Sequence, residues 1–172
     1  MGLTQRRART NDASEILALI NDPASPHRQE SCCHREDPEE ATMLFDRLDE
    51  DENLVLVEGG QIVAYASWQV FAAHAHLNVL AVAGAQQRRG LGKRLFEAFL
   101  AELREDHIES YTLRAYKDSA WAMAFYERLG LAPCEAPELL VPRYPGLAHY
   151  VSMALASGQW PVTEKALFFD RV

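Results

Sequence analysis

The segment 77–104 changes its hydrophobic period at a pair of glycines. Leu77–Val82 is a short apolar run with β-branched residues, which predicts a strand. After Gly90 and Gly92, apolar residues recur at every fourth position among charged ones, which predicts an amphipathic helix with Leu91, Leu95, Phe99 and Leu103 on its buried face. The segment therefore predicts a strand, a glycine turn and a helix, which is a building unit of α/β proteins.

The glycine turn has the chemistry of an anion site. The first N–H groups of a helix have no intrahelical acceptor, and the helix dipole makes that end positive. Arg88, Arg89 and Lys93 add positive charge, so a pyrophosphate fits this turn. A Gly-x-Gly pair by itself can also do no more than join a strand to a helix.

Two common nucleotide-binding turns are excluded at this position. A P-loop needs Ser or Thr after its lysine, and Arg94 follows Lys93 here. A dinucleotide-binding turn needs a third glycine three residues after Gly92, where Leu95 stands.

The spacing of apolar residues and the start signals of helices predict secondary structure along the rest of the chain. Asp12 with Glu15 three residues later predicts a capped helix start, and Gly59-Gly60 predicts a tight hairpin turn. Residues 21–36, with two prolines, two histidines and the adjacent cysteines, are predicted to form an irregular loop. The predicted strands are 4–10, 54–57, 61–71, 77–82, 111–115, 131–135 and 149–155, and the predicted helices begin at Asp12, Asp37, Leu91 and Asp118. Alternation of these elements indicates a mixed α/β single domain.

The length and the C-terminal residues suggest how the chain is organised. A chain of 172 residues suits one core, which we place in a domain at 1–155. The tail 156–172 is too apolar for a solvated end, since it carries Trp160, Leu167, Phe168 and Phe169. We expect it to pack on the domain or on a second copy, and therefore expect a homodimer.

The net charge and the positions of the cysteines restrict the partners that we expect for this protein. The net charge of −8 disfavours nucleic acid, whose phosphates need a basic surface. No apolar run approaches the ~20 residues of a membrane helix and no secretory signal is present, so we expect a cytoplasmic protein without a membrane partner. The adjacent Cys32 and Cys33, with His34, lack the spacing of zinc ligands, so we expect no metal.

Two motifs resemble those of the GNAT superfamily of N-acetyltransferases. Gln87-Arg88-Arg89-Gly90-Leu91-Gly92 is similar to its motif A, Gln/Arg-x-x-Gly-x-Gly/Ala. The run 119–130, from Ser119 to Gly130 with Tyr126 inside it, is similar to motif B, Asn-x-x-Ala-x-x-Leu/Phe-Tyr-x-x-x-Gly-Phe. The resemblance covers residues 77–131. Two departures are Ser119 at the position of the family's Asn and Leu131 at that of the Phe.

The resemblance implies a fold and an activity. The fold is a central mixed, mostly antiparallel twisted sheet of about seven strands, flanked by about four helices. The activity is transfer of an acetyl group from acetyl-CoA, by direct attack, to a primary amine of a small molecule or a protein. A non-catalytic acyl-CoA-binding or sensing domain is the alternative. The implied cofactor-binding residues are Leu80, Ala81, Val82, Gln87, Arg88, Arg89, Gly90, Leu91, Gly92, Lys93, Ser119 and Tyr126.

The resemblance also implies catalytic residues. Tyr126 stands where the family's tyrosine protonates the leaving thiolate, although helical spacing alone predicts only a core aromatic. His76 stands eleven residues before Gln87, where the family's histone acetyltransferases carry a glutamate base, and a histidine ordinarily titrates near neutrality. Its alternative is a surface histidine at a strand start. Glu58 and His74 are weaker candidates for the base.

Overall fold

The computed structural model describes residues 2–25, 48, 50–116, 119–134, 137–148 and 165–171. The chain divides into two compact parts, which we describe separately. The first part comprises Met1–Gln69 and Asn78–Glu102, and the second comprises Val70–Leu77 and Leu103–Val172. The strand β4 (His74–Val82) contributes residues to both parts.

The first part is built on antiparallel strands. β1 (Thr4–Arg6) pairs with β2 (Glu52–Glu58), and β2 pairs with β3 (Gln61–Phe71), which lies next to β4 in the strand order. Gly59 and Gly60 join β2 to β3 with φ angles of 61° and 86°. Both angles lie in the left-handed region that a two-residue hairpin turn requires, so the predicted turn is confirmed.

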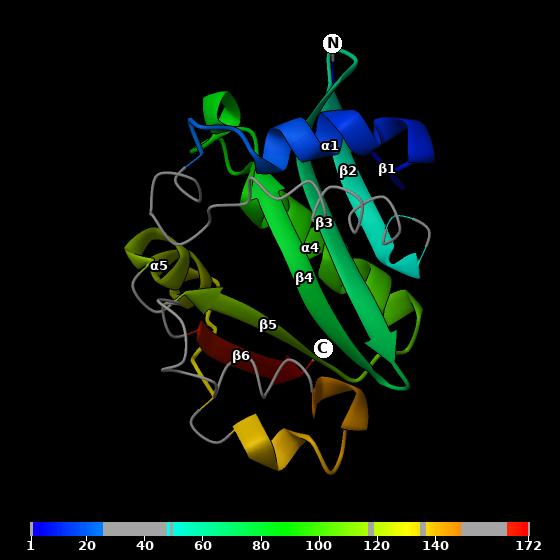
Figure 1. Cartoon of the computed structure of the whole chain (residues 1–172), viewed down its shortest axis with the longest axis vertical. Coiled ribbons are helices and arrows are strands. Elements are labelled where there is room, and N and C mark those ends of the chain that lie inside the picture. Colours follow the sequence, from blue (N-terminus) through cyan, green and yellow to red (C-terminus); the bar gives the residue numbers. More distant parts are fainter. Residues whose placement is uncertain are drawn as a thin grey trace. The chain divides into compact units, whose positions relative to one another are not determined.

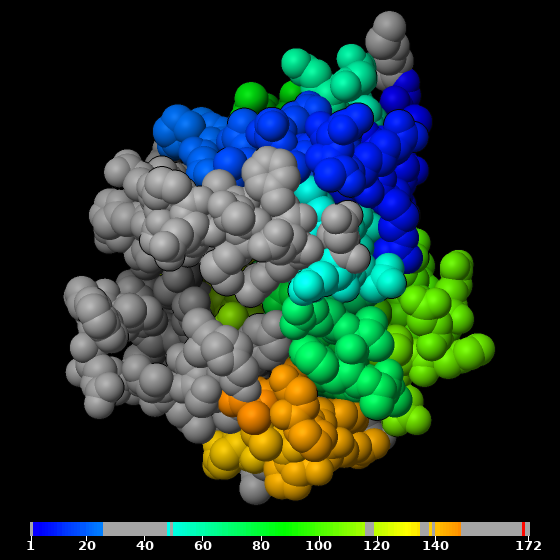
Figure 2. Space-filling view, turned by 45° about the vertical axis from the view of Figure 1, so that its right-hand side comes forward, coloured from blue at the N-terminus to red at the C-terminus, as the bar shows by residue number. Residues whose placement is uncertain are grey.

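Two helices of the first part cover opposite faces of its strands (Figure 1). α1 (Ala13–Ile20) packs Ile16 and Ile20 into a cluster with Val55 and Tyr65, which are paired residues on β2 and β3. α4 (Leu91–Glu105) brings Phe99 within 5.1 Å of the Trp68 ring, centroid to centroid. Tyr65 and Trp68 are three positions apart on β3, so they face opposite sides of the sheet. The outer side of α1 forms the blue band of surface in Figure 2.

The second part is built around a parallel strand pair. The first residues of β4 pair in parallel with β5 (Ser110–Tyr116), from His74↔Ser110 to Leu77↔Leu113. β6 (Lys165–Arg171) pairs antiparallel with β5 over its whole length. α5 (Ala120–Arg128) is followed by the C-cap residue Leu129 and by Gly130, whose φ of 87° allows the chain to turn away from the helix.

Four 3₁₀ turns complete the described elements. They are η1 (Thr10–Asp12), η2 (Gly84–Gln86), η3 (Pro137–Leu140) and η4 (Pro145–Leu147). Tyr144, which directly precedes η4, and Leu147, its last residue, form a small core with Phe71, Leu140 and Val141 in the second part.

The described residues confirm most predicted elements but not all. Six strands and three α-helices have bounds within the described ranges, against about seven and four expected. The strand predicted at 131–135 is wrong over its described residues, because Leu131–Cys134 contain only a single bridge residue at Pro133. The second half of the predicted tail is instead a strand, β6. The strand predicted at 149–155 and residues 37–47 of a predicted helix lie outside the described residues.

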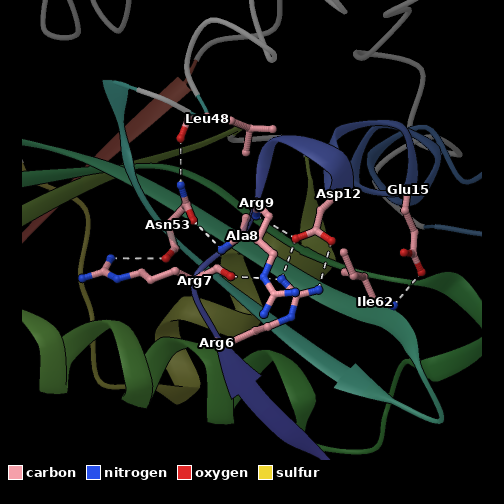
Figure 3. Close-up of polar contacts among 9 residues, drawn as sticks. All are labelled: Arg6, Arg7, Ala8, Arg9, Asp12, Glu15, Leu48, Asn53 and Ile62. Carbon is pink, nitrogen blue, oxygen red and sulfur yellow. Dashed lines mark hydrogen bonds and ion pairs between the residues drawn. The ribbon is translucent and has the colours of Figure 1, made fainter.

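The start of α1 differs from the predicted capping box (Figure 3). The Asp12 carboxylate makes no cap hydrogen bond to α1 and instead accepts from the Arg6 guanidinium, at 2.5 and 2.9 Å, and from the Arg9 N–H, which caps η1, at 2.7 Å. Glu15 accepts from the Ile62 N–H at 2.6 Å. Both carboxylates therefore tie α1 to neighbouring segments, a use that the local sequence does not reveal.

Asn53 is a buried polar side chain that joins three backbone segments (Figure 3). Its Oδ1 accepts from the Ala8 N–H at 2.7 Å, and its Nδ2 donates to the carbonyls of Leu48 and Asp51 at 3.2 and 3.1 Å. Removing this amide leaves one donor and two acceptors without their partner away from water, which is costly.

We therefore predict that Asn53→Ala lowers the free energy of unfolding by about 1–3 kcal/mol, the cost of leaving buried polar groups unsatisfied. Urea unfolding measures the change. Thr4→Ala, which removes an exposed hydroxyl bonded to the Val57 carbonyl at 3.3 Å, is the control and should change stability by no more than about 0.5 kcal/mol. Equal effects of the two variants would contradict the prediction.

Candidate active site

The turn between β4 and α4 presents a row of backbone donors. The first helical hydrogen bond of α4 runs from the Arg94 N–H to the Gly90 carbonyl at 3.0 Å, so the N–H groups of Leu91, Gly92 and Lys93 have no acceptor within the helix. Gly90 has a φ of 79°, and a Cβ added to it would meet nothing within 4 Å. The turn is therefore open where a phosphate would approach the backbone.

Only one glycine of the motif needs its conformational freedom. Gly90 has a left-handed backbone, whereas Gly92 lies inside α4. Arg88 also has a positive φ, 60°, which is uncommon for a residue with a side chain and was not foreseen. The turn stores some backbone strain at Arg88, a feature that clusters at ligand-binding sites.

The charges of the turn are partly neutralised from within the protein. Arg89 donates to both carboxylate oxygens of Glu58, at 2.7 and 2.9 Å, and to the Gln86 side chain. Lys93 lies 3.7 Å from Glu97 on the next turn of α4. The Arg89 guanidinium holds the pKa of Glu58 below its ordinary value, so Glu58 is a weaker base than an unpaired glutamate.

The loop before the turn is held by a carboxylate just after α1, on Asp22, which sequence reasoning missed. Asp22 accepts from the Gly84 N–H at 2.6 Å and from the Ala24 N–H at 2.9 Å. A Cβ on Gly84 would lie 2.6 Å from the Ala24 Cβ, so only glycine fits there. No local signal in the sequence marks this contact, because Asp22 and Gly84 are far apart in the chain.

The second half of β4 supplies the other expected cofactor contacts. Leu80, Ala81 and Val82 are half-buried, and Ala81 packs against the α1 cluster. Over the described residues, the register between β4 and β5 ends at Leu77↔Leu113. The backbone of residues 78–82 therefore continues as a strand beyond its pairing with β5, as expected for a strand that binds an extended ligand arm.

α5 carries the motif B residues in the second part. Ser119 directly precedes the helix and is 3% exposed, and its hydroxyl has no hydrogen-bond partner among the described residues. A buried hydroxyl of this kind fits a site completed by a bound ligand. Tyr126 is buried on α5, and burial raises the pKa of its phenol well above the ordinary value. The phenol is therefore protonated at neutral pH.

His76 is not the surface histidine considered from the sequence. Its side chain is completely buried, and its Nδ1 lies 2.7 Å from the Thr112 Oγ1. Burial, followed by the charges of Arg114 and His74, lowers the pKa of His76 well below its ordinary value. The expectation that His76 titrates near neutrality is therefore wrong, because the charged imidazolium cannot be solvated there.

His76 belongs to a buried chain of polar side chains in the second part. His74 lies 2.8 Å from the Ser110 Oγ through Nδ1 and 3.0 Å from the Thr112 Oγ1 through Nε2. Ser110 in turn donates to the Tyr144 hydroxyl at 2.9 Å. The alternation His-x-His and Ser-x-Thr is visible in the sequence, but only the parallel register places the two pairs opposite each other.

The described residues add two negative findings. None of the described helices is long and apolar enough to cross a membrane. Within the same residues, no group of three or more His, Cys, Asp or Glu side chains is arranged to hold a metal ion, and Cys32, Cys33 and His34 lie outside them.

The motif A turn, the motif B helix and the sheet order define an N-acetyltransferase. The model of the acetyltransferase (GNAT) family matches residues 15–131, so the chain belongs to this family. A relative from Escherichia coli K12, the [ribosomal protein bS18]-alanine N-acetyltransferase, is 32% identical over 103 residues, which cover 60% of this chain and 70% of the relative.

Solved structures confirm the fold. The crystal structure of the ribosomal-protein-S18-alanine N-acetyltransferase from Escherichia coli matches with a TM-score of 0.70 and 20% identity, over 99% of this chain and 94% of that one. The PaiA N-acetyltransferase from Thermoplasma acidophilum, solved in complex with coenzyme A, matches with a TM-score of 0.69 and 9% identity, over 100% of both chains.

The buried histidines predict acid sensitivity. Burial lowers the pKa of His74 to about 4, below the 6.5 of an unfolded histidine. Between these values the unfolded chain binds more protons than the folded one, so the free energy of unfolding should fall as pH drops from about 6.5 towards 4. Urea unfolding across this range measures the slope.

His74→Gln removes one titrating group and should flatten that slope. Ser67→Ala, which removes a buried hydroxyl of β3 and no titrating side chain, is the control and should leave the slope as it is. An unchanged slope in His74→Gln would show that His74 does not contribute to acid sensitivity.

Proposed function

We propose that the chain transfers the acetyl group of acetyl-CoA to the α-amine at the N-terminus of a protein. The similarity to an alanine N-acetyltransferase of a ribosomal protein supports a protein acceptor. We choose an α-amine because both candidate bases, His76 and Glu58, have lowered pKa values and are therefore weak bases.

The protonation of the acceptor explains this choice. An α-amine has a pKa near 8, so roughly a tenth of it is neutral at pH 7, whereas a lysine with a pKa near 10.4 is neutral in only about one molecule in 2,500. An enzyme without a strong base acts best on an amine that arrives partly deprotonated. The site therefore suits an α-amine better than a lysine side chain.

The residues of the turn and of β4 would hold the donor. The N–H groups of Leu91, Gly92 and Lys93 would bind its pyrophosphate, with Arg88 and Arg89 beside it. The backbone of Leu80–Val82 would pair with its pantetheine arm, and Ser119 would offer its buried hydroxyl to the same arm. Acetyl-CoA, when bound, supplies a thioester carbonyl that an amine attacks.

Tyr126 would donate a proton to the leaving thiolate. Burial raises the pKa of its phenol, so the proton is present at neutral pH. A leaving thiolate in the same water-excluded surroundings would also have a raised pKa, which is what transfer of the proton to the sulfur requires. This role rests on the motif B match, because helical spacing alone explains Tyr126 as a core aromatic.

Two further expectations stay predictions, namely a homodimer and a cytoplasmic location.

We predict that millimolar acetyl-CoA raises the melting temperature. A ligand at one hundred times its dissociation constant stabilises the fold by about 2.7 kcal/mol. Replacing Gly90 and Gly92 together by Val should abolish the rise, because side chains fill the approach to the N–H groups. Gly60→Val is the control, since it removes another left-handed glycine, at φ 86°, away from the turn, and should keep the rise.

We predict a preference for N-terminal amines. A peptide with a free N-terminal alanine should release coenzyme A thiol faster, at neutral pH, than the same peptide blocked at its N-terminus and carrying one lysine. Equal rates, or a faster lysine peptide, would argue against the α-amine. Binding of acetyl-CoA without turnover on any amine would favour the sensing domain instead.

We predict that Tyr126→Phe lowers turnover by up to the 10²–10⁴-fold typical of acid–base groups, with acetyl-CoA binding nearly unchanged. The variant keeps the ring and its packing against Phe125, at 5.2 Å between centroids, and removes only the proton. Tyr65→Phe, which removes a buried phenol from the first part, should leave turnover close to wild type. Comparable losses in both variants would assign the effect to packing.

A further inference from the structure

The turn between β4 and α4 is held by backbone contacts at its start and at its end, but not in its middle. At the start, the Gly84 N–H donates to the Asp22 carboxylate at 2.6 Å. At the end, the Arg94 N–H donates to the Gly90 carbonyl at 3.0 Å and begins the hydrogen bonding of α4. Within the part of the chain that the structure describes, no backbone–backbone hydrogen bond involves residues 88–89. Side chains must therefore hold this middle segment.

Arg88 makes the middle segment unfavourable by itself. Its φ of 60° lies in the left-handed region, where the Cβ of an ordinary residue comes too close to the following carbonyl oxygen. Gly90 has a φ of 79°, but it has no Cβ and adopts this region freely. The open form of the turn is therefore one that the backbone of Arg88 disfavours, and other contacts have to stabilise it.

The side chain of Arg89 supplies such contacts. Its guanidinium donates from one terminal nitrogen to Glu58 Oε2 at 2.7 Å and from the other to Glu58 Oε1 at 2.9 Å. The first nitrogen also donates to the Gln86 side-chain oxygen. Glu58 is the last residue of β2 and is paired with Gln61 across the hairpin, so the sheet fixes its position. A bidentate pair of this kind also fixes the orientation of the guanidinium.

The same pair keeps Arg89 from serving as a phosphate ligand. A guanidinium that turned towards a pyrophosphate would leave the Glu58 carboxylate unpaired next to a second anion, and like charges at short range repel each other. Arg88 and Lys93 are exposed and remain as the other cations close to the N–H groups of the turn. The bidentate contact therefore favours a structural task for Arg89 within the turn.

We propose that Glu58 and Arg89 are positioning residues, which hold the turn between β4 and α4 in the form that binds the donor, and that Arg89 makes no contact with the pyrophosphate. The proposal rests on the proposed function, because it takes acetyl-CoA as the ligand of the turn. It gives Glu58, a candidate base from the sequence, a part in donor binding. It also removes Arg89 from the residues that contact the cofactor according to the family resemblance.

The opposite assignment of Arg89 predicts an effect of opposite sign. If Arg89 bound the pyrophosphate, Glu58 would compete with the donor for the guanidinium, and removing the carboxylate would tighten donor binding. If the pair holds the turn, removing the carboxylate weakens donor binding, because the binding-competent form is then present in a smaller fraction of the molecules.

Isothermal titration calorimetry with coenzyme A measures this sign. Glu58→Gln and Arg89→Gln should each raise the Kd by about 2- to 5-fold, the range that exposed ion pairs reach. The double variant, which restores the net charge of the turn, should lie in the same range, because both substitutions remove the same contact. The KM for acetyl-CoA should rise by the same factor, with kcat and the KM for the acceptor peptide close to wild type.

Glu52→Gln is the matched control, because it removes the same charge from the other end of β2, where Glu52 lies 2.7 Å from Arg7. It should leave the Kd of coenzyme A as it is. Tighter or unchanged binding in Glu58→Gln would overturn the positioning role, and so would a double variant that shows the product of the two single losses. A wild type that binds no coenzyme A would overturn the proposed function, and the positioning role with it.

Carbon NMR of the labelled Glu58 carboxyl shows whether the pair persists when the donor site is filled. In the free protein, the Arg89 guanidinium holds the pKa of Glu58 below its ordinary value. With saturating coenzyme A, this pKa should stay below the pKa of Glu58 in Arg89→Gln under the same conditions. A wild-type pKa that rises on binding to the value in Arg89→Gln would show that Arg89 has turned to the phosphates. That result would refute the proposal without any measurement of turnover.

Discussion

The pairing of β4 is the constraint on which the rest of the structure depends. Its first residues are fixed in parallel register with β5 up to Leu77, and its later residues run on to the loop at Gly84. A parallel strand pair needs a long crossover connection, which the chain supplies with the glycine turn and α4. The register thereby determines which side chains of β4 and β5 stand opposite each other, and the end of the pairing frees the backbone that we propose binds the donor.

Burial of polar groups gives the two parts their specific contacts. In the first part, Asn53, Asp12 and Glu15 each satisfy backbone or side-chain donors from other segments. In the second part, the two histidines are completely buried yet hydrogen-bonded through Thr112. A buried polar group without a hydrogen-bond partner destabilises the folded state, whereas hydrogen-bonded buried groups favour one specific arrangement of the chain. The same burial lowers the pKa of the histidines and removes the near-neutral base that the sequence suggested.

The proposed chemistry follows from these protonation states. Tyr126 keeps its proton because burial raises the pKa of its phenol, and Glu58 is a weak base because it is paired with Arg89. An acceptor that arrives partly neutral suits such a site. The two candidate bases are weak for different reasons, because burial destabilises the charged form of His76 whereas the ion pair with Arg89 stabilises the charged form of Glu58.

The sequence by itself determined the local features of this protein. Residues close in the chain set the turn at Gly59-Gly60, the glycine turn before α4, the start and the apolar face of α4 and the two motifs of the family, because each depends on backbone preferences and short periodicities. Tertiary structure decided the rest. The roles of Asp12 and Glu15, the Asp22 contact to Gly84, β6 as a strand and the burial of His76 depend on segments far apart in the chain. A residue's charge and hydrogen-bond partners are properties of its surroundings, and only folding brings those surroundings together.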